Sequence, residues 1–115
     1  LVVHSTSGLL SRVDPLTGAA TTVDTGGASL TNGDGMLLRG RTLYVVRNRD
    51  NRVDVLSLDP SGTRATVVRT ITSPRFDVPT TVARFGNRLY LPNARFTTPP
   101  TPSTPYSVTQ VPAGP

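Results

Sequence analysis

The chain of 115 residues is 36% hydrophobic and 5% aromatic, and it contains 10 glycines and 11 prolines. Because glycine and proline interrupt helix interiors, this composition predicts an all-β fold made of short strands separated by turns. The lack of cysteine excludes disulfides, iron–sulfur clusters, thiolate zinc sites and a cysteine nucleophile. No apolar run approaches the roughly 18 residues of a membrane helix, so we expect no membrane partner.

All 12 basic residues are arginine and all seven acidic residues are aspartate, which gives a formal net charge of +5. This usage is typical of codon bias in a GC-rich genome. A nucleic-acid interface would need arginines clustered with exposed aromatic residues, whereas these arginines are scattered from Arg12 to Arg95. We therefore expect an ordinary solvated basic surface and no nucleic-acid partner.

The most informative feature is an internal repeat. Residues 40–46 (GRTLYVV) align with residues 86–92 (GNRLYLP) at an offset of 46. The triplet VDP at 13–15 returns as LDP at 58–60, an offset of 45. A period of about 45 residues matches one four-stranded blade of a β-propeller.

Strand-sized segments fill the repeat in the order that a blade requires. Apolar and polar residues alternate in segment 52–58 of the middle unit, and we expect Val53, Val55 and Leu58 to face one neighbouring unit. Turn residues separate the segments, as in Asp59-Pro60-Ser61-Gly62. The predicted strands are 35–39, 42–48, 52–58 and 64–71 in the middle unit, and 80–85, 88–93 and 106–111 in the last unit.

These units predict one domain, with a partial blade at 1–30, a complete blade at 31–76, and a last blade at 77–115 that lacks its outer strand. A propeller needs roughly four to eight blades to close its ring. We therefore expect a C-terminal fragment, partnered by missing N-terminal blades of the same chain. Alone it would leave apolar blade faces bare, so we do not expect these residues to fold stably in isolation.

In such blades, the loops before the innermost strand and those between the second and third strands gather at one end of the central channel. Binding sites concentrate on loops that a rigid scaffold presents. The motif NGDGM at 32–36 is the sharpest one there, because its glycines let the backbone come close to a ligand or ion beside Asp34. The residues expected at this end are His4, Asp34, Arg47, Asn48, Arg49, Asp50, Asn51, Asp77, Thr80, Asn93 and Arg95.

Two interpretations of Asp34 follow from the residues alone. A hard cation such as calcium would accept its carboxylate oxygen together with asparagine and backbone carbonyl oxygens. The alternative is a turn aspartate that caps backbone amides. A carboxylate or phosphate could similarly be bound by Arg47, Arg49, Asn93 and Arg95. Salt bridges to Asp50, Asp54 or Asp77 are the favoured alternative.

His4 is the only histidine, which argues against a Ser/His/Asp triad. It could line a pocket or carry a proton, and a strand-end histidine that makes hydrogen bonds is the favoured alternative. Residues 97–105 are rich in proline and threonine, which predicts an extended polyproline-like loop. This loop is expected to be either a lid over the channel mouth or, more simply, a solvated connector.

Several of these segments together resemble a known family. The motif DGM at 34–36, with LYVV at 43–46, NRV at 51–53, LDP at 58–60 and GNRLYL at 86–91, is similar to the closing blades of the gluconolactonase, regucalcin and luciferin-regenerating-enzyme (senescence-marker-protein-like) family. These proteins are six-bladed propellers in which the aspartate of a PDGM segment binds a divalent ion. That aspartate corresponds to Asp34, whereas Gly33 departs from the family's proline, and the family's Glu and Asn ligands belong to earlier blades.

The resemblance implies a metal-dependent hydrolase of lactone-type small molecules. A calcium or zinc ion would be the cofactor, with Asp34 as metal ligand and catalytic residue, and His4, Arg47, Asn48, Thr80, Asn93 and Arg95 would line the substrate pocket. Related NHL-like propellers share the blade pattern without a metal, so the alternative is a non-catalytic scaffold that binds a ligand or protein partner at the channel face. The family's bacterial members and the Thr/Pro loop favour an extracytoplasmic location.

Overall fold

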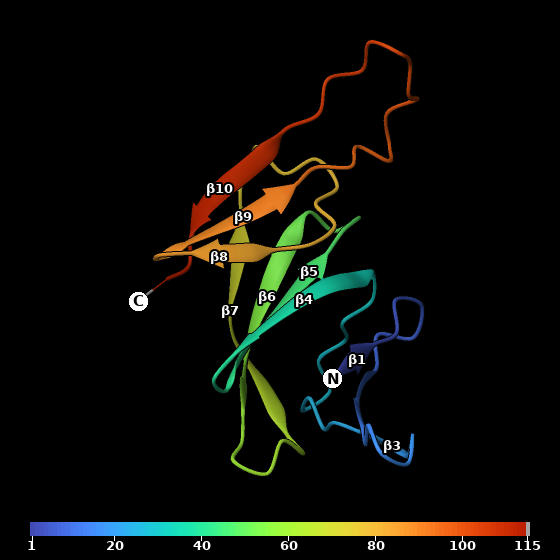
Figure 1. The fold of residues 1–115 in the computed structure, drawn as a ribbon, viewed down its shortest axis with the longest axis vertical. Helices are drawn as coiled ribbons and strands as arrows, with labels where there is room; N and C mark the ends of the chain where they lie inside the picture. The colour runs from blue at the N-terminus through green and yellow to red at the C-terminus, as the bar shows by residue number, and fades with distance from the viewer. Residues whose placement is uncertain (115) are drawn as a thin grey trace.

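The computed structural model describes residues 1–114, in which ten strands form three antiparallel sheets and no helix is present (Figure 1). The all-β prediction is therefore confirmed. Each sheet is built from strands that are consecutive in the sequence. The first sheet contains β1 (Val2–Val3), β2 (Leu10–Val13) and β3 (Ala20–Thr22); the middle sheet contains β4 (Gly33–Arg39), β5 (Thr42–Arg47), β6 (Arg52–Leu58) and β7 (Ala65–Thr72); the third contains β8 (Ala83–Phe85), β9 (Arg88–Pro92) and β10 (Val108–Pro112).

The predicted strands of the middle and last units lie within two residues of the observed ones, except for the strand predicted at 80–85. That segment becomes a strand only at β8, three residues later than predicted. The reason is the hydrogen bonding of Thr80, whose carbonyl oxygen accepts the Gly35 amide of β4 at 2.8 Å. The Thr80 amide still donates to the Pro92 carbonyl oxygen of β9 at 3.2 Å, so Thr80 joins the middle and third sheets and the regular pairing of β8 with β9 begins only at Ala83.

Both faces of the middle sheet are buried, each against one neighbouring sheet. Along β5 and β6, alternate side chains point to opposite faces, as in any strand. One cluster joins Tyr44, Val46, Val53 and Val55 to Phe76, Leu89, Leu91 and Val111 of the third unit. The other joins Leu43, Val45, Leu56 and Leu58 to Leu10, Val23 and Leu30 of the first. Leu58 thus faces away from Val53 and Val55, and the prediction that it shares their face is wrong because alternation places it with Leu56.

The turns between strands use the residues that the sequence pattern indicated. Gly40 joins β4 to β5 with a φ of 58°, a conformation that glycine adopts without steric cost. Gly62 closes the turn after β6 by donating its amide to the Asp59 carbonyl oxygen at 3.0 Å. A hydrogen bond from the Ser61 hydroxyl, followed by bonds from the Arg64 and Thr63 amides, lowers the pKa of the Asp59 carboxyl from its ordinary value.

The strand β4 lies between the first and third units (Figure 1), and both units approach its first residues closely. A Cβ atom placed on Gly33 would lie 2.6 Å from Val3 Cγ2, and one placed on Gly35 would lie 2.6 Å from Thr81 Cα. Because the glycines on either side of Asp34 have no side chain, Val3 and Thr81 can approach the backbone of β4 closely. This contact explains the Gly-Asp-Gly spacing without a bound ligand.

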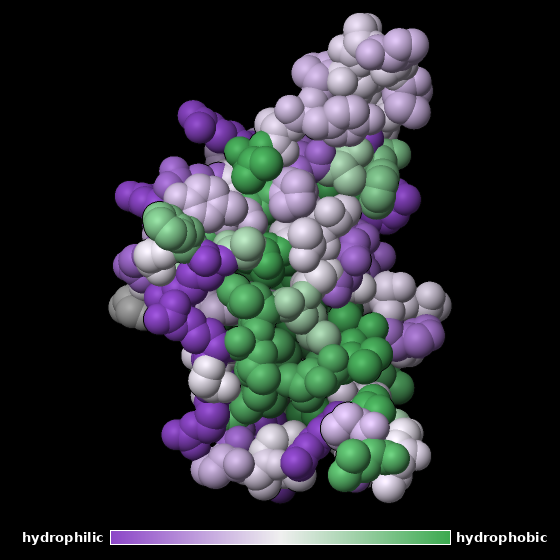
Figure 2. All heavy atoms as spheres, viewed as in Figure 1, coloured by the Kyte–Doolittle hydropathy of each residue, from purple (hydrophilic) through white to green (hydrophobic). Residues whose placement is uncertain are grey.

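Figure 2 shows apolar side chains gathered over β4 and the neighbouring β1 on the face in view. Leu38 at the end of β4 is 51% exposed, and Val2 in β1 is 52% exposed. In the third sheet, Phe85 is 80% exposed and Val108 is 63% exposed. Large apolar side chains are thus accessible on the first, middle and third sheets.

Replacing Gly35 by alanine should lower the free energy of unfolding by about 2 kcal/mol, because a backbone atom of Thr81 must move to admit the methyl group. Gly35 is not among the residues with positive φ, so the loss reports this contact and not backbone strain. Urea unfolding monitored by circular dichroism would measure the change. Thr66→Ser, at an exposed position of β7, is the control and should change stability by less than about 0.5 kcal/mol. Equal stability of Gly35→Ala and the wild type would contradict the close approach.

Candidate functional site

Polar loop residues of all three units meet at the end of the molecule where β4 begins and β5 ends. The Asn32 amide donates to the Ser5 carbonyl oxygen at 2.8 Å, which joins the middle unit to the first. The Val78 amide donates to Asn51 Oδ1 at 2.8 Å, which joins the third unit to the middle one. We call this end the polar end; the two Asp-Pro turns lie away from it, where Arg12 donates to the Ser61 carbonyl oxygen at 2.7 Å.

Asp34 lies on a β-bulge at the start of β4. Gly33 is opposite Arg47 and Met36 is opposite Val45, so β4 carries one residue more than β5 over this stretch. Asp34 is exposed, and its Oδ2 accepts a hydrogen bond from Asn48 Nδ2 at 3.1 Å. The partner is a side-chain amide, so the interpretation of Asp34 as a turn residue that caps backbone amides does not describe the observed contact.

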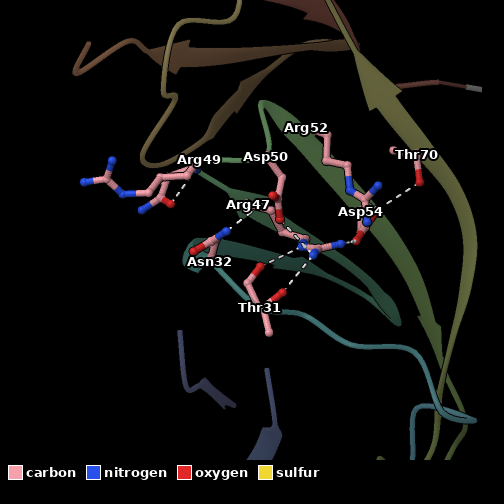
Figure 3. A network of polar contacts seen from close by, with 9 residues as sticks. Thr31, Asn32, Arg47, Arg49, Asp50, Arg52, Asp54 and Thr70 are labelled. Carbon is pink, nitrogen blue, oxygen red and sulfur yellow. Dashed lines mark hydrogen bonds and ion pairs between the residues drawn. The ribbon is translucent and has the colours of Figure 1, made fainter. Parts of the chain in front are cut away.

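Arg47 is the centre of a buried polar network at the end of β5 (Figure 3). Its Nη2 lies 2.8 Å from Asp50 Oδ2, and its Nη1 lies 3.1 Å from Asp54 Oδ2. The same guanidinium donates to the Thr31 carbonyl oxygen at 2.8 Å and to the Thr31 hydroxyl at 3.1 Å. The guanidinium therefore fastens the segment before β4, the loop after β5 and the strand β6 to one another.

Asp54 was expected only as one of three possible salt-bridge partners and was not among the residues expected at the polar end. It is 3% exposed, although it lies between Val53 and Val55 in an otherwise apolar part of β6. Besides Arg47, the Asp54 carboxylate accepts the Thr70 hydroxyl at 2.8 Å and lies 3.6 Å from Arg52 Nε. The sequence signal for this network was an acidic residue inside an otherwise apolar strand. A carboxylate buried there requires a charged or hydrogen-bonding partner.

Asn93 forms a second buried network, which supports the segment before β8. Its Oδ1 accepts the Asp77 amide at 2.9 Å, and its Nδ2 donates to the Thr109 hydroxyl at 2.9 Å. Arg95 extends the network, since its Nε lies 2.9 Å from Asp77 Oδ2 and its Nη1 donates to the Pro105 carbonyl oxygen at 3.0 Å. The bond from Arg95 to Pro105 holds the C-terminal end of the Pro/Thr-rich loop (97–105) in place.

The remaining predicted residues lie at the edge of the polar end. The exposed His4 accepts the Ser7 amide on Nδ1 at 3.0 Å, which is the hydrogen-bonding role expected of a strand-end histidine. The Arg49 guanidinium lies 5.9 Å from the ring centre of Phe96, a cation–π contact between the hairpin loop and the Pro/Thr-rich loop. Thr80 is bonded through its backbone to β4 and to Pro92.

The arrangement therefore leaves Asp34 exposed and hydrogen-bonded to the half-buried Asn48, and it ties Arg47, Asn93 and Arg95 into contacts within the chain. Within residues 1–114, no group of three or more His, Cys, Asp or Glu side chains is arranged to hold a metal ion. Asp34 with Asn48 could supply only part of a hard-cation site, whose usual ligand number is about six to eight.

Comparison with protein-family models, with curated proteins and with solved structures gives no match to this chain. In the described part of the chain there is also no helix with the length and apolar character needed to cross a membrane.

Replacing Arg47 by methionine should destabilise the protein by about 3 kcal/mol, because the buried Asp54 carboxylate would lose its closest charged partner. Denaturant unfolding would measure the loss. Arg49→Met is the matched control, since Arg49 is exposed and its substitution should cost about 0.5 kcal/mol. A comparable effect of the two substitutions would show that the Arg47 network does not stabilise the fold.

Proposed function

We propose that the three sheets are blades of a β-propeller and that the chain is part of a metal-dependent hydrolase that acts on lactone-type small molecules. The consecutive antiparallel sheets, packed face to face through two apolar clusters, support the propeller. In this proposal β4 is the innermost strand of its blade, so the polar end borders the central channel.

The observation that carries the proposal is the position of Asp34 on a β-bulge of β4. Bulges are frequent beside active sites, where they redirect a side chain. Asp34 is exposed, and the Asn48 amide holds one of its oxygens at 3.1 Å. A fixed, exposed carboxylate is the type of ligand that a hard divalent cation prefers.

A divalent ion bound at this position would supply Lewis-acid polarisation of a lactone carbonyl. Asp34 would bind the ion, and Asn48 would orient the Asp34 carboxylate through its Nδ2 donor. The donor set fits calcium, which prefers oxygen ligands, better than it fits zinc, which prefers nitrogen and sulfur. The further ligands would come from outside this pair.

Asp34→Asn should weaken calcium binding at least tenfold, because it removes the charged ligand and leaves a neutral one. Isothermal titration with calcium and with zinc, together with hydrolysis of a sugar lactone, would measure the two effects. Asp14→Asn is the matched control, since Asp14 is an exposed turn aspartate whose Oδ1 accepts the Leu16 amide. Equal calcium affinity of the wild type and Asp34→Asn would remove Asp34 from the site and with it the hydrolase proposal.

A non-catalytic scaffold that binds a ligand or protein partner is the second candidate. It is favoured by the internal bonding of Arg47, Asn93 and Arg95, which leaves few polar groups at the polar end to act on a substrate. A protein that binds neither calcium nor zinc and does not hydrolyse lactones, while keeping its fold, would support this candidate.

A further inference from the structure

A second concave site lies between the middle and third sheets, at the end of β4 opposite Asp34. This pocket has a volume of about 410 Å³. Arg39, the last residue of β4, and Thr42, the first of β5, belong to its lining, whereas Asp34 and Asn48 lie toward the other ends of these strands. We call it the arginine pocket, after Arg39, Arg69 and Arg84, which line it together with Tyr44.

The charge of the arginine pocket is unbalanced. Three arginines line it, and among residues 1–114 no aspartate does. The ion pairs found within the described residues are made by Arg47, Arg52, Arg64 and Arg95, and none of these arginines lines the pocket. Like charges around one space repel each other, so a bound anion would relieve that repulsion.

Two of the three guanidiniums are held in place by the surrounding structure. Arg84 donates to the Gly86 carbonyl oxygen at 3.0 Å, to the Tyr44 hydroxyl at 3.2 Å and to Asn87 Oδ1 at 3.4 Å. Because a guanidinium has five N–H groups, these three bonds leave Arg84 with unused donors. Arg69 donates to the Ala113 carbonyl oxygen, which also accepts the Tyr44 hydroxyl at 3.4 Å.

Arg39 differs from these two arginines. It is exposed, and within the described residues its guanidinium makes no hydrogen bond or ion pair. The pocket thus combines two fixed donors with a third cation at its edge that is free to contact a ligand. Fixed donors favour binding because less conformational entropy is lost when the ligand is held.

The number of donors indicates the chemical class of the anion. A carboxylate has one charge and two oxygens, which one arginine can satisfy in a bidentate pair. Three arginines match better a group with a charge near two and three free oxygens, which describes a phosphate monoester. Val68, which is 57% exposed, also lines the pocket and provides an apolar surface for an organic moiety.

We propose that the arginine pocket binds a phosphorylated small organic molecule through its phosphate group. The site is distinct from the polar end and does not depend on the function proposed for Asp34. Glucose 6-phosphate, inorganic phosphate, glucose and citrate are the probes that test it.

Isothermal titration of the protein should show binding of glucose 6-phosphate, weaker binding of inorganic phosphate, and no binding of glucose. Arg39→Gln should reduce the affinity for glucose 6-phosphate about tenfold, equivalent to the loss of one charged contact. Arg41→Gln is the matched control, because Arg41 is an exposed arginine two residues away that does not line the pocket. Arg41→Gln should leave the affinity within about twofold of the wild type.

Arg84→Met should abolish binding of glucose 6-phosphate. If Arg84→Met does not fold, Arg39→Gln still tests the pocket, because Arg39 has no bonded partner in the described chain and its substitution should not disturb the fold. Lack of binding by the wild type would overturn the proposal, as would an equal effect of Arg41→Gln and Arg39→Gln. Binding of citrate without binding of either phosphate compound would overturn the assignment to phosphate. Equal affinities for inorganic phosphate and glucose 6-phosphate would overturn the role of the apolar wall.

Discussion

Burial of both faces of the middle sheet is the constraint on which the rest of the structure depends. Because β5 and β6 pack against a neighbouring sheet on each side, their central residues are almost all apolar and buried. Polar groups are then excluded from the sheet faces unless a partner is built in, as for Asp54 and Arg47. Exposed polar groups therefore lie mainly at the ends of the strands and along the outer strand β7.

The close packing of β4 connects the fold to the candidate site. Gly33 and Gly35 admit the first and third units, and the bulge between them turns the Gly35 amide toward Thr80 and not toward β5. The two glycines and the bulge between them therefore join the three units and leave the carboxylate of Asp34 exposed. A side chain at either glycine position would separate the units, so the spacing of this motif has a packing explanation that holds with or without a ligand.

Much of the fold could be predicted from the sequence, because the repeat of LYVV and LDP segments marks strands and turns through local alternation and turn chemistry. The start of β8 could not, since the hydrogen bond from Gly35 to Thr80 joins residues that are far apart in the chain. The polar end was predicted as a group of loops. Salt bridges from the arginines of the polar end to Asp50, Asp54 or Asp77 were predicted as well, and three such pairs are present. The burial of the Arg47–Asp54 pair was not predicted, because it depends on which faces of β5 and β6 meet a neighbour.

Arginines near the two ends of the strands differ in whether an aspartate lies close to them. This difference determines how the net charge of +5 is distributed over the fold. Near the polar end, Arg47 and Arg95 each lie within 4 Å of an aspartate carboxylate. At the opposite end, Arg39, Arg69 and Arg84 line one pocket to which no aspartate of residues 1–114 contributes. Arginines that are scattered in the sequence are thus gathered by the fold. Arg39, Arg69 and Arg84 thus place three positive charges without an aspartate partner around one pocket, where they can act together on one small anion.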